Sequence, residues 1–187
     1  MAAVQDIAFD LLLKDQKNQR ALEALTYFDV LGAFQNSSEE VTVQNFSEPN
    51  PVDVRTFTMP QNGDWGDVIF LHPPNQLTIA LDLPDRPTSF VSRLAMAPES
   101  WDWGGDGAVF IVEASADGGL PEVIFEQQID NQSDNRRWHD VSVSLDQFSG
   151  RSITLTLRTE IGPNQNDVGD WAGWDAPRII FAESMAE

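Results

Sequence analysis

The chain has 187 residues, of which 41% are hydrophobic, so it carries enough apolar surface for one well-buried core and is not composed like a disordered chain. Its 30 acidic residues outnumber 11 lysines and arginines, and the net charge of -19 disfavours nucleic acid and anionic lipid as partners. The chain contains no cysteine, which excludes disulfides, thiolate zinc sites and thiol catalysis.

The N-terminal segment has apolar residues at helical spacing. Two groups keep the same phase across the polar stretch "KDQKNQR": Val4, Ile7, Ala8 and Leu11, then Leu22, Leu25 and Phe28. One long helix or two short helices fit this pattern, so we expect an N-terminal helical arm over residues 1–36, packed on the domain or extending from it as a stalk. The first residues lack the regions of a signal peptide, and no segment approaches the roughly 20 apolar residues of a membrane span, so we expect no direct membrane insertion.

From residue 41 onward the hydrophobic period changes from helical to two. Residues 77–83, 141–145 and 153–159 alternate between apolar and polar side chains, which predicts half-buried strands. Further strands are expected at 41–45, 52–58, 68–71, 89–96, 108–115, 122–129 and 178–182. Eight or more strands separated by Gly and Pro turns, without helical patterns between them, predict an antiparallel β-sandwich over residues 37–187.

Four stretches of the sequence resemble a known family. They are "VIFLHPPNQLTIALDLP", "LAMAPESWDWGGDGAVFIVEA", "DNRRWHDVSVSLDQFSGRSITLTLRT" and "GDWAGWDAPRI", and they span roughly the last two thirds of the chain. Together they are similar to galactose-binding-like jelly-roll modules, both non-catalytic carbohydrate-binding modules and extracytoplasmic domains associated with bacterial membrane glycosyltransferases. The resemblance implies a mainly β, two-sheet jelly roll and an extracytoplasmic location, periplasmic or at the cell surface. The helical arm and "GDWGDVIF" depart from the family, so Asp64 and Trp65 inherit no role from it.

Sugar recognition requires an aromatic face for stacking and carboxylates that accept hydrogen bonds from hydroxyl groups. Three stretches combine both types, and they supply the candidate carbohydrate-binding residues Asp64, Trp65, Asp102, Trp103, Asp170 and Trp171. For Trp65, Trp103 and Trp171, a ligand-facing position and a core position are both open. The core is the favoured position for Trp101, Trp138 and Trp174. Asp170 is favoured as an acceptor for loop backbone amides over a ligand contact.

Metal binding and catalysis receive less support from the sequence. Calcium is a candidate structural ion, because "WDWGGDG" offers Asp102 and Asp106 and "PNQNDVGD" offers further oxygen ligands, Asn164, Asn166, Asp167 and Asp170. Neither stretch has the spacing of an EF-hand loop, so no residue is assigned as a metal ligand. The two histidines, His72 and His139, belong to no catalytic motif. We therefore assign no catalytic residue and predict that the chain is not an enzyme.

The sequence leads to two functional hypotheses from different classes. The first is a non-catalytic carbohydrate-binding or glycan-presenting module, an extracytoplasmic part of a membrane glycosyltransferase system. The second is a structural or protein-interaction module, in which the Leu22, Leu25 and Phe28 face of the helical arm docks another protein or a second copy of the chain. An enzyme built on the sandwich is a weaker third hypothesis, since it would need a carboxylate pair at catalytic separation.

Overall fold

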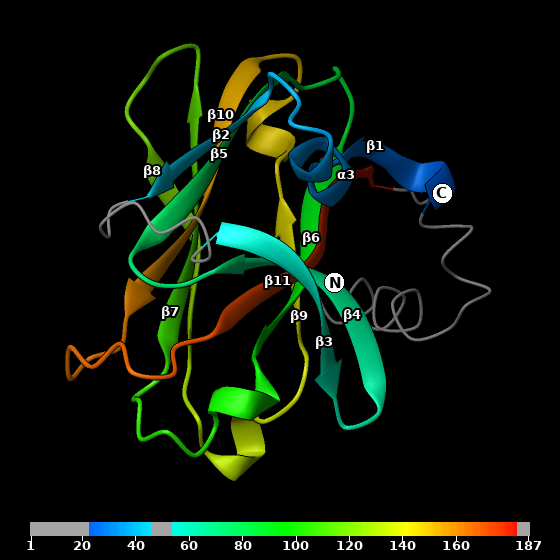
Figure 1. Ribbon diagram of the computed structural model, residues 1–187. Coiled ribbons are helices and arrows are strands. Elements are labelled where there is room, and N and C mark those ends of the chain that lie inside the picture. Colours follow the sequence, from blue (N-terminus) through cyan, green and yellow to red (C-terminus); the bar gives the residue numbers. More distant parts are fainter. Residues whose placement is uncertain (1–22, 46–53, 183–187) are drawn as a thin grey trace.

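Two antiparallel sheets packed face to face form the protein (Figure 1), as the alternating sequence pattern predicts. The structure is a computed structural model that describes residues 23–45 and 54–182. Sheet A has the strand order β3-β4-β11-β6-β9, and β1 pairs with the free part of β11. Sheet B has the order β2-β5-β10-β7-β8.

Most strands lie close to the predicted ranges, but β4 and β11 begin several residues earlier than expected and β1 was not predicted. Sheet A contains β1 (Thr26–Asp29), β3 (Val54–Gln61), β4 (Asp64–Leu71), β6 (Thr88–Met96), β9 (His139–Ser144) and β11 (Ala172–Phe181). Sheet B contains β2 (Val41–Asn45), β5 (Asn75–Asp82), β7 (Ala108–Ala116), β8 (Glu122–Ile129) and β10 (Ser152–Ile161). Short helical turns complete the described chain: α3 (Val30–Gln35), η1 (Pro98–Ser100), η2 (Ser133–Asn135) and η3 (Asp146–Phe148). None of the helices within the described ranges is long and apolar enough to cross a membrane.

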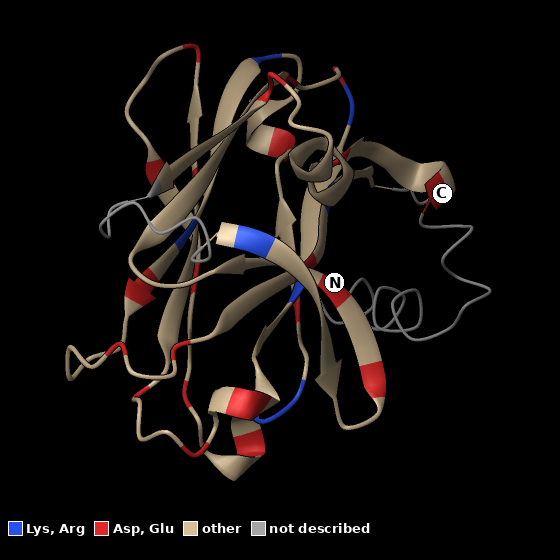
Figure 2. Cartoon of the chain, in the orientation of Figure 1, with Lys and Arg blue, Asp and Glu red and all other residues tan. Residues whose placement is uncertain are grey.

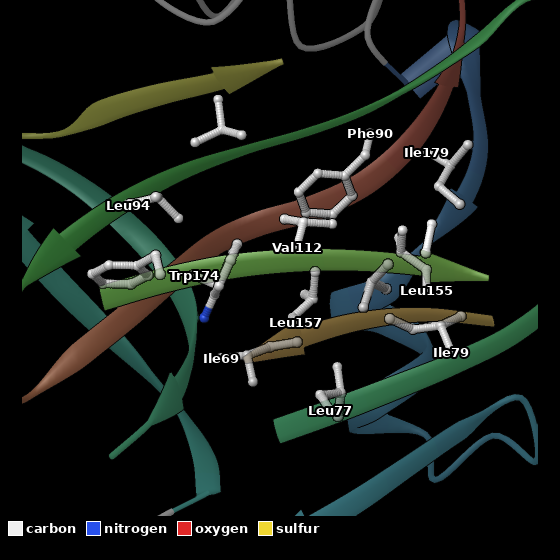
Figure 3. Packing of buried hydrophobic residues seen from close by; sticks show 14 of the residues in the cluster. Ile69, Leu77, Ile79, Phe90, Leu94, Val112, Leu155, Leu157, Trp174 and Ile179 are labelled. Carbon is white, nitrogen blue, oxygen red and sulfur yellow. The ribbon is translucent and has the colours of Figure 1, made fainter. Parts of the chain in front are cut away.

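The main core fills the space between the two sheets, and Trp174 lies in its middle (Figure 3). Its ring is fully buried, with centroids 6.3 Å from Phe90 and 5.3 Å from Phe110. The core position predicted for Trp174 is therefore confirmed. Trp138 is also buried, and Trp101 is partly buried with its indole N–H donating to the Met96 carbonyl.

The proline in the last strand occupies a bulge. On one edge, β11 pairs with β6 in two runs, and the register shifts between Asp175 and Arg178. Ala176 has a φ of 41° and Pro177 follows it within this irregular stretch. A proline has no N–H to donate to the ladder, so a bulge is a place where the strand tolerates it.

The N-terminal segment is where the structure departs from the sequence-based expectation. The pattern predicts helix as far as residue 31, but residues 26–29 form β1 and pair with residues 178–180 of β11. Their burial alternates, with Phe28 packed on the main core and Tyr27 facing outward, so a period-two segment was hidden in an apparent helical period. Residues 26–35 therefore belong to the sandwich, although the expected boundary of the arm is residue 36.

The residues of the predicted docking face that the structure describes are packed into the sandwich. Leu25 packs against Val91 and Ile180, so neither it nor Phe28 is available as part of a free docking surface. Val30, the first residue of α3, is completely buried. Leu22 and the rest of the predicted arm lie outside the described residues.

The β3–β4 hairpin bends across the outer face of sheet A. Met59 lies directly against Gly173 of β11, and the side-chain amide of Gln61 donates to the Met96 carbonyl at 2.7 Å. A second, smaller core forms beneath the hairpin from Met59, Val68, Ala95, Ala97 and Trp138, with Phe57 and Trp171 packed on it. The stretch "GDWGD", expected as a loop, is consequently the beginning of β4.

Gly66 provides a test of this packing. A Cβ at Gly66 would lie 2.6 Å from Cγ of Asp175 and 2.8 Å from Cζ2 of Trp138, both buried. We expect Gly66→Ala to lower the free energy of unfolding by about 1–3 kcal/mol, because neither neighbour can move aside easily. Thermal unfolding would measure the loss, with Gly119→Ala as the matched control at an exposed turn, where the nearest atom to the new Cβ is the Ala116 carbonyl oxygen at 3.1 Å. Equal melting temperatures for both variants would contradict the packing described here.

Candidate functional site

Two of the predicted tryptophans lie side by side. Trp103 comes from the loop between β6 and β7, and Trp171 immediately precedes β11. Their ring centroids are 5.1 Å apart, with an angle of 73° between the planes. Trp103 is 51% exposed and Trp171 is partly buried, so the pair offers an accessible aromatic surface whose inner member is anchored in the protein.

The pair continues into an aromatic row, defined here as Trp103, Trp171, Phe70 and Phe57. Phe70 is 6.0 Å from Trp171 and 5.7 Å from Phe57 between ring centroids. The guanidinium group of Arg55 lies 5.4 Å from the centre of the Phe70 ring, and the ring centroid of His72 lies 6.3 Å from that of Phe70. Sequence reasoning missed these residues, because they belong to strands and only the register of β3 with β4 brings them together.

Close backbone contact between two loops fixes the position of the tryptophan pair. A Cβ on Gly105 would lie only 2.0 Å from the carbonyl oxygen of Val168. Gly169 has a φ of 74°, and a Cβ there would lie 3.2 Å from Cβ of Trp103. The side-chain amide of Asn166 also donates to the Gly104 carbonyl at 2.9 Å. Only glycine permits this approach, which holds the two loops in one relative position.

Asp170 lies beneath this surface rather than on it. The residue is fully buried, and neither carboxyl oxygen has a hydrogen-bond partner within the described part of the chain. Burial raises its pKa from 3.8 to about 7, and the nearby charge of Asp106 adds to the shift. The amides of Gly107 and Gly162 face the carboxyl group and lower the pKa, without reaching hydrogen-bond geometry. Asp170 is thus buried under the loops, and its carboxyl group makes none of the hydrogen bonds to loop amides that the sequence favours.

The acidic residues proposed for calcium are only partly brought together. Asp106 and Asp170 are close neighbours, and a buried oxygen of Asp106 also has no partner among the described atoms. Asp102 instead forms an exposed ion pair with Arg136 at 2.9 Å. Over the described ranges, no group of three or more His, Cys, Asp or Glu residues is arranged to hold a metal ion. Calcium remains a hypothesis, with Asp106 and Asp170 as the carboxylates available to it.

Asp64 and Trp65 belong to a separate group on β4. Trp65 is 63% exposed and makes none of the ring contacts found among the described aromatic residues. Asp64 is paired with Arg93 at 2.5 Å, and Arg93 also binds the buried Asp175 at 2.6 Å. Burial raises the pKa of Asp175 to about 6 against the opposing effect of Arg93. The six predicted residues therefore form no single cluster.

The two histidines lie in different surroundings. His72 is next to Phe70 in the aromatic row, whereas His139 is buried and interacts with Gln127 and the Asn135 carbonyl. Burial lowers the pKa of His139, which favours its neutral form. The structure thus gives neither histidine a carboxylate partner that would mark a catalytic pair within the described residues.

The buried Asp170 predicts a pH effect. Because its pKa is raised on folding, the folded state holds a proton that the unfolded state releases between pH 3.8 and about 7, so stability falls as the pH rises through this window. Asp170→Asn removes the effect and should melt several degrees above the parent protein above pH 7, with no difference near pH 4. Melting curves in EDTA would measure this, with the exposed Glu99→Gln as control. Parallel pH profiles for Asp170→Asn and the parent would refute the prediction.

No protein-family model matches the sequence. An uncharacterized protein of Archaeoglobus fulgidus is 35% identical over 120 residues, which are 60% of this chain and 30% of that protein. The chain therefore spans less than a third of the length of this relative.

Solved structures similar to this chain are carbohydrate-binding modules. The CBM51-2 and INT domains of Clostridium perfringens ZmpB match with a TM-score of 0.50 and 13% identity, over 76% of this chain and 30% of that one. TmCBM61, solved with beta-1,4-galactotriose, has a TM-score of 0.49 and 13% identity over 77% and 90% of the two chains. CBM51 of Clostridium perfringens GH95, solved with methyl-galactose, has a TM-score of 0.46 and 17% identity over 75% and 87%. At 13% identity the likeness to the CBM51-2 and INT domains shows the fold alone, which is a two-sheet antiparallel β-sandwich.

Proposed function

We propose that the chain is a non-catalytic carbohydrate-binding module whose glycan stacks on Trp103 and Trp171. The observation that carries the proposal is the convergence of these two rings, 5.1 Å apart, from different loops at one end of the sandwich. Trp103 offers the accessible face, since half of its surface is exposed. The fold shared with carbohydrate-binding modules supports the proposal without determining the ligand.

The surroundings of the pair suit a polyhydroxylated ligand. Pyranose rings present an apolar face to an aromatic ring, while their hydroxyl groups require polar partners at the edge of the platform. Asp102, adjacent to Trp103 and held by Arg136, is the proposed acceptor for a hydroxyl group. Asp170 acts indirectly, as a positioning residue under the loops. Because glycine contacts fix the loops before binding, little additional ordering is required when the ligand arrives.

Asp64 and Trp65 are proposed as a second contact on β4, used by a longer glycan. Trp65 is the most exposed of the described tryptophans, and the Arg93 ion pair fixes the carboxylate beside it. If Trp65 contacts only longer ligands, Trp65→Ala leaves the binding of short oligosaccharides unchanged. This difference makes Trp65 a matched comparison for Trp103.

The wider context belongs to the same proposal. The family resemblance supports an extracytoplasmic location and association with a membrane glycosyltransferase, for which this module would bind or present a glycan. The relative in Archaeoglobus fulgidus, more than three times as long as the matching part, is consistent with a module that occurs within a larger polypeptide. The competing hypothesis of a docking arm loses two of its residues, because Leu25 and Phe28 are packed into the sandwich.

A glycan array on the purified chain tests the proposal, once with calcium and once with EDTA. We expect weak binding to a restricted set of oligosaccharides, with dissociation constants of about 10 μM to 1 mM. Trp103→Ala should weaken this binding at least about tenfold with an unchanged melting temperature, because the exposed ring contributes little to folding. Trp65→Ala serves as the comparison variant for short ligands.

The outcomes separate the parts of the proposal. A blank array with folded protein, or full binding by Trp103→Ala, would reject the aromatic pair as the glycan site. Loss of binding in EDTA would identify a metal requirement, and a lower melting temperature in EDTA would place the ion in the folded structure. Equal loss with both tryptophan variants on short ligands would extend the site to β4.

A further inference from the structure

A second hollow lies away from the aromatic row, at the other end of β10. It has a volume of about 610 Å³, and its wall includes Tyr27, Glu40, Asp82, Gly118, Ser152 and Thr154. Strand β10 begins at Ser152 in this groove and ends at Ile161, just before the loop that leads to Trp171. Ten residues of extended chain place the two sites roughly 30 Å apart along the strand.

The described residues that line the groove give it negative charge. Glu40 and Asp82 supply two carboxylates, and the described lining residues include no Lys, Arg or His. Each carboxylate accepts a hydrogen bond from a neutral hydroxyl group, Glu40 from Ser38 and Asp82 from Ser152. The Ser38 hydroxyl holds the pKa of Glu40 below its usual value, so the group stays ionised. These bonds orient the carboxylates but leave their charges unbalanced.

The arginines nearest to the groove in sequence are already engaged. Arg151, next to Ser152, is paired with Asp117 at 2.8 Å. Arg86 lies over the ring of Phe181, with its guanidinium carbon 3.8 Å from the ring centre. Neither arginine pairs with Glu40 or Asp82 in the described structure. Neither of these two arginines therefore balances the carboxylates of the groove, which a cationic group on a ligand would do.

Tyr27 gives the groove an ordered aromatic wall. Its hydroxyl group donates to the Asp82 carbonyl at 2.5 Å, and its ring lies 5.4 Å from Phe181. The side chain is 38% exposed, so part of the ring surface is open to a ligand. An aromatic ring beside two carboxylates is a combination that attracts an ammonium group, through cation–π and ionic contacts together.

From this arrangement we propose that the groove between Tyr27, Glu40 and Asp82 binds the protonated amine of an amino sugar. The amine is expected between the two carboxylates, with the hydroxyl groups of Ser152 and Thr154 and the spare carboxylate oxygens serving the ligand's hydroxyl groups. A sugar fits better than a single lysine side chain, because the hydroxyl groups of Ser152 and Thr154 line the groove beside the carboxylates and can serve a ligand's hydroxyl groups. The proposal does not depend on the aromatic row.

Isothermal titration of the full chain with a trimer of glucosamine, below neutral pH, tests this site. We expect binding of the trimer and none of its N-acetylated counterpart, because acetylation removes the charge that the carboxylates recognise. Glu40→Gln with Asp82→Asn should weaken binding at least about tenfold. Asp82→Asn keeps an oxygen to accept the Ser152 hydrogen bond, and Glu40→Gln alone provides a milder variant at an exposed position.

Two controls separate a built site from general attraction to an acidic protein. Glu99→Gln with Asp134→Asn removes the same charge at exposed positions outside the groove and should leave the affinity unchanged. Trp103→Ala should also have no effect, so failure of this site and failure of the aromatic row are distinguishable. Absence of trimer binding, equal weakening by the control pair, or equally tight binding of trilysine would each overturn the proposal.

Discussion

The packing of Trp174 between Phe90 and Phe110 is the constraint on which the rest of the structure depends. Trp174 is in β11, which pairs with β6 along one edge and with β4 and then β1 along the other. Burying a ring of this size stabilises the fold by roughly 4–6 kcal/mol, more than the roughly 1–3 kcal/mol lost because its indole N–H has no partner among the described groups. Fixing β11 fixes Trp171 at its start and Asp175 in its middle, and so places both candidate surfaces of sheet A.

The scarce arginines of this acidic chain act mainly as clamps between segments that are distant in sequence. Arg93 joins Asp64 to Asp175, Arg136 holds Asp102, and Arg158 holds Glu113 and Glu160. Figure 2 shows the acidic residues distributed over the loops at both ends of the sandwich, with far fewer basic segments between them. Most of the described carboxylates belong to none of these ion pairs. Burial beside Asp106 raises the pKa of Asp170 to about 7, whereas Glu40 and Asp82 are exposed in the Tyr27 groove.

How far the sequence could be interpreted depended on whether the deciding interactions are local. Most strands of the two sheets follow from side-chain alternation. The buried position of Trp174 was expected from the family resemblance, since the predicted last strand began only at residue 178. Thr26–Asp29 escaped recognition because four residues are too few to separate a period of two from a helical one. The contacts of Trp171 with Trp103 and Phe70, and the burial of Asp170, arise from pairing between remote strands, which no local pattern records.

The contact between Gly105 and the Val168 carbonyl has a consequence for how this surface can change during evolution. The two loops meet there backbone to backbone. An insertion close to Gly105 or Gly169 would therefore separate Trp103 from Trp171 and destroy the aromatic pair in a single step. The exposed residues 163–165, by contrast, lie at the tip of the loop between β10 and β11, three or more residues before Val168 and Gly169 in the sequence. New ligand preferences are therefore more accessible to this lineage through side-chain replacement at the tip than through changes in loop length.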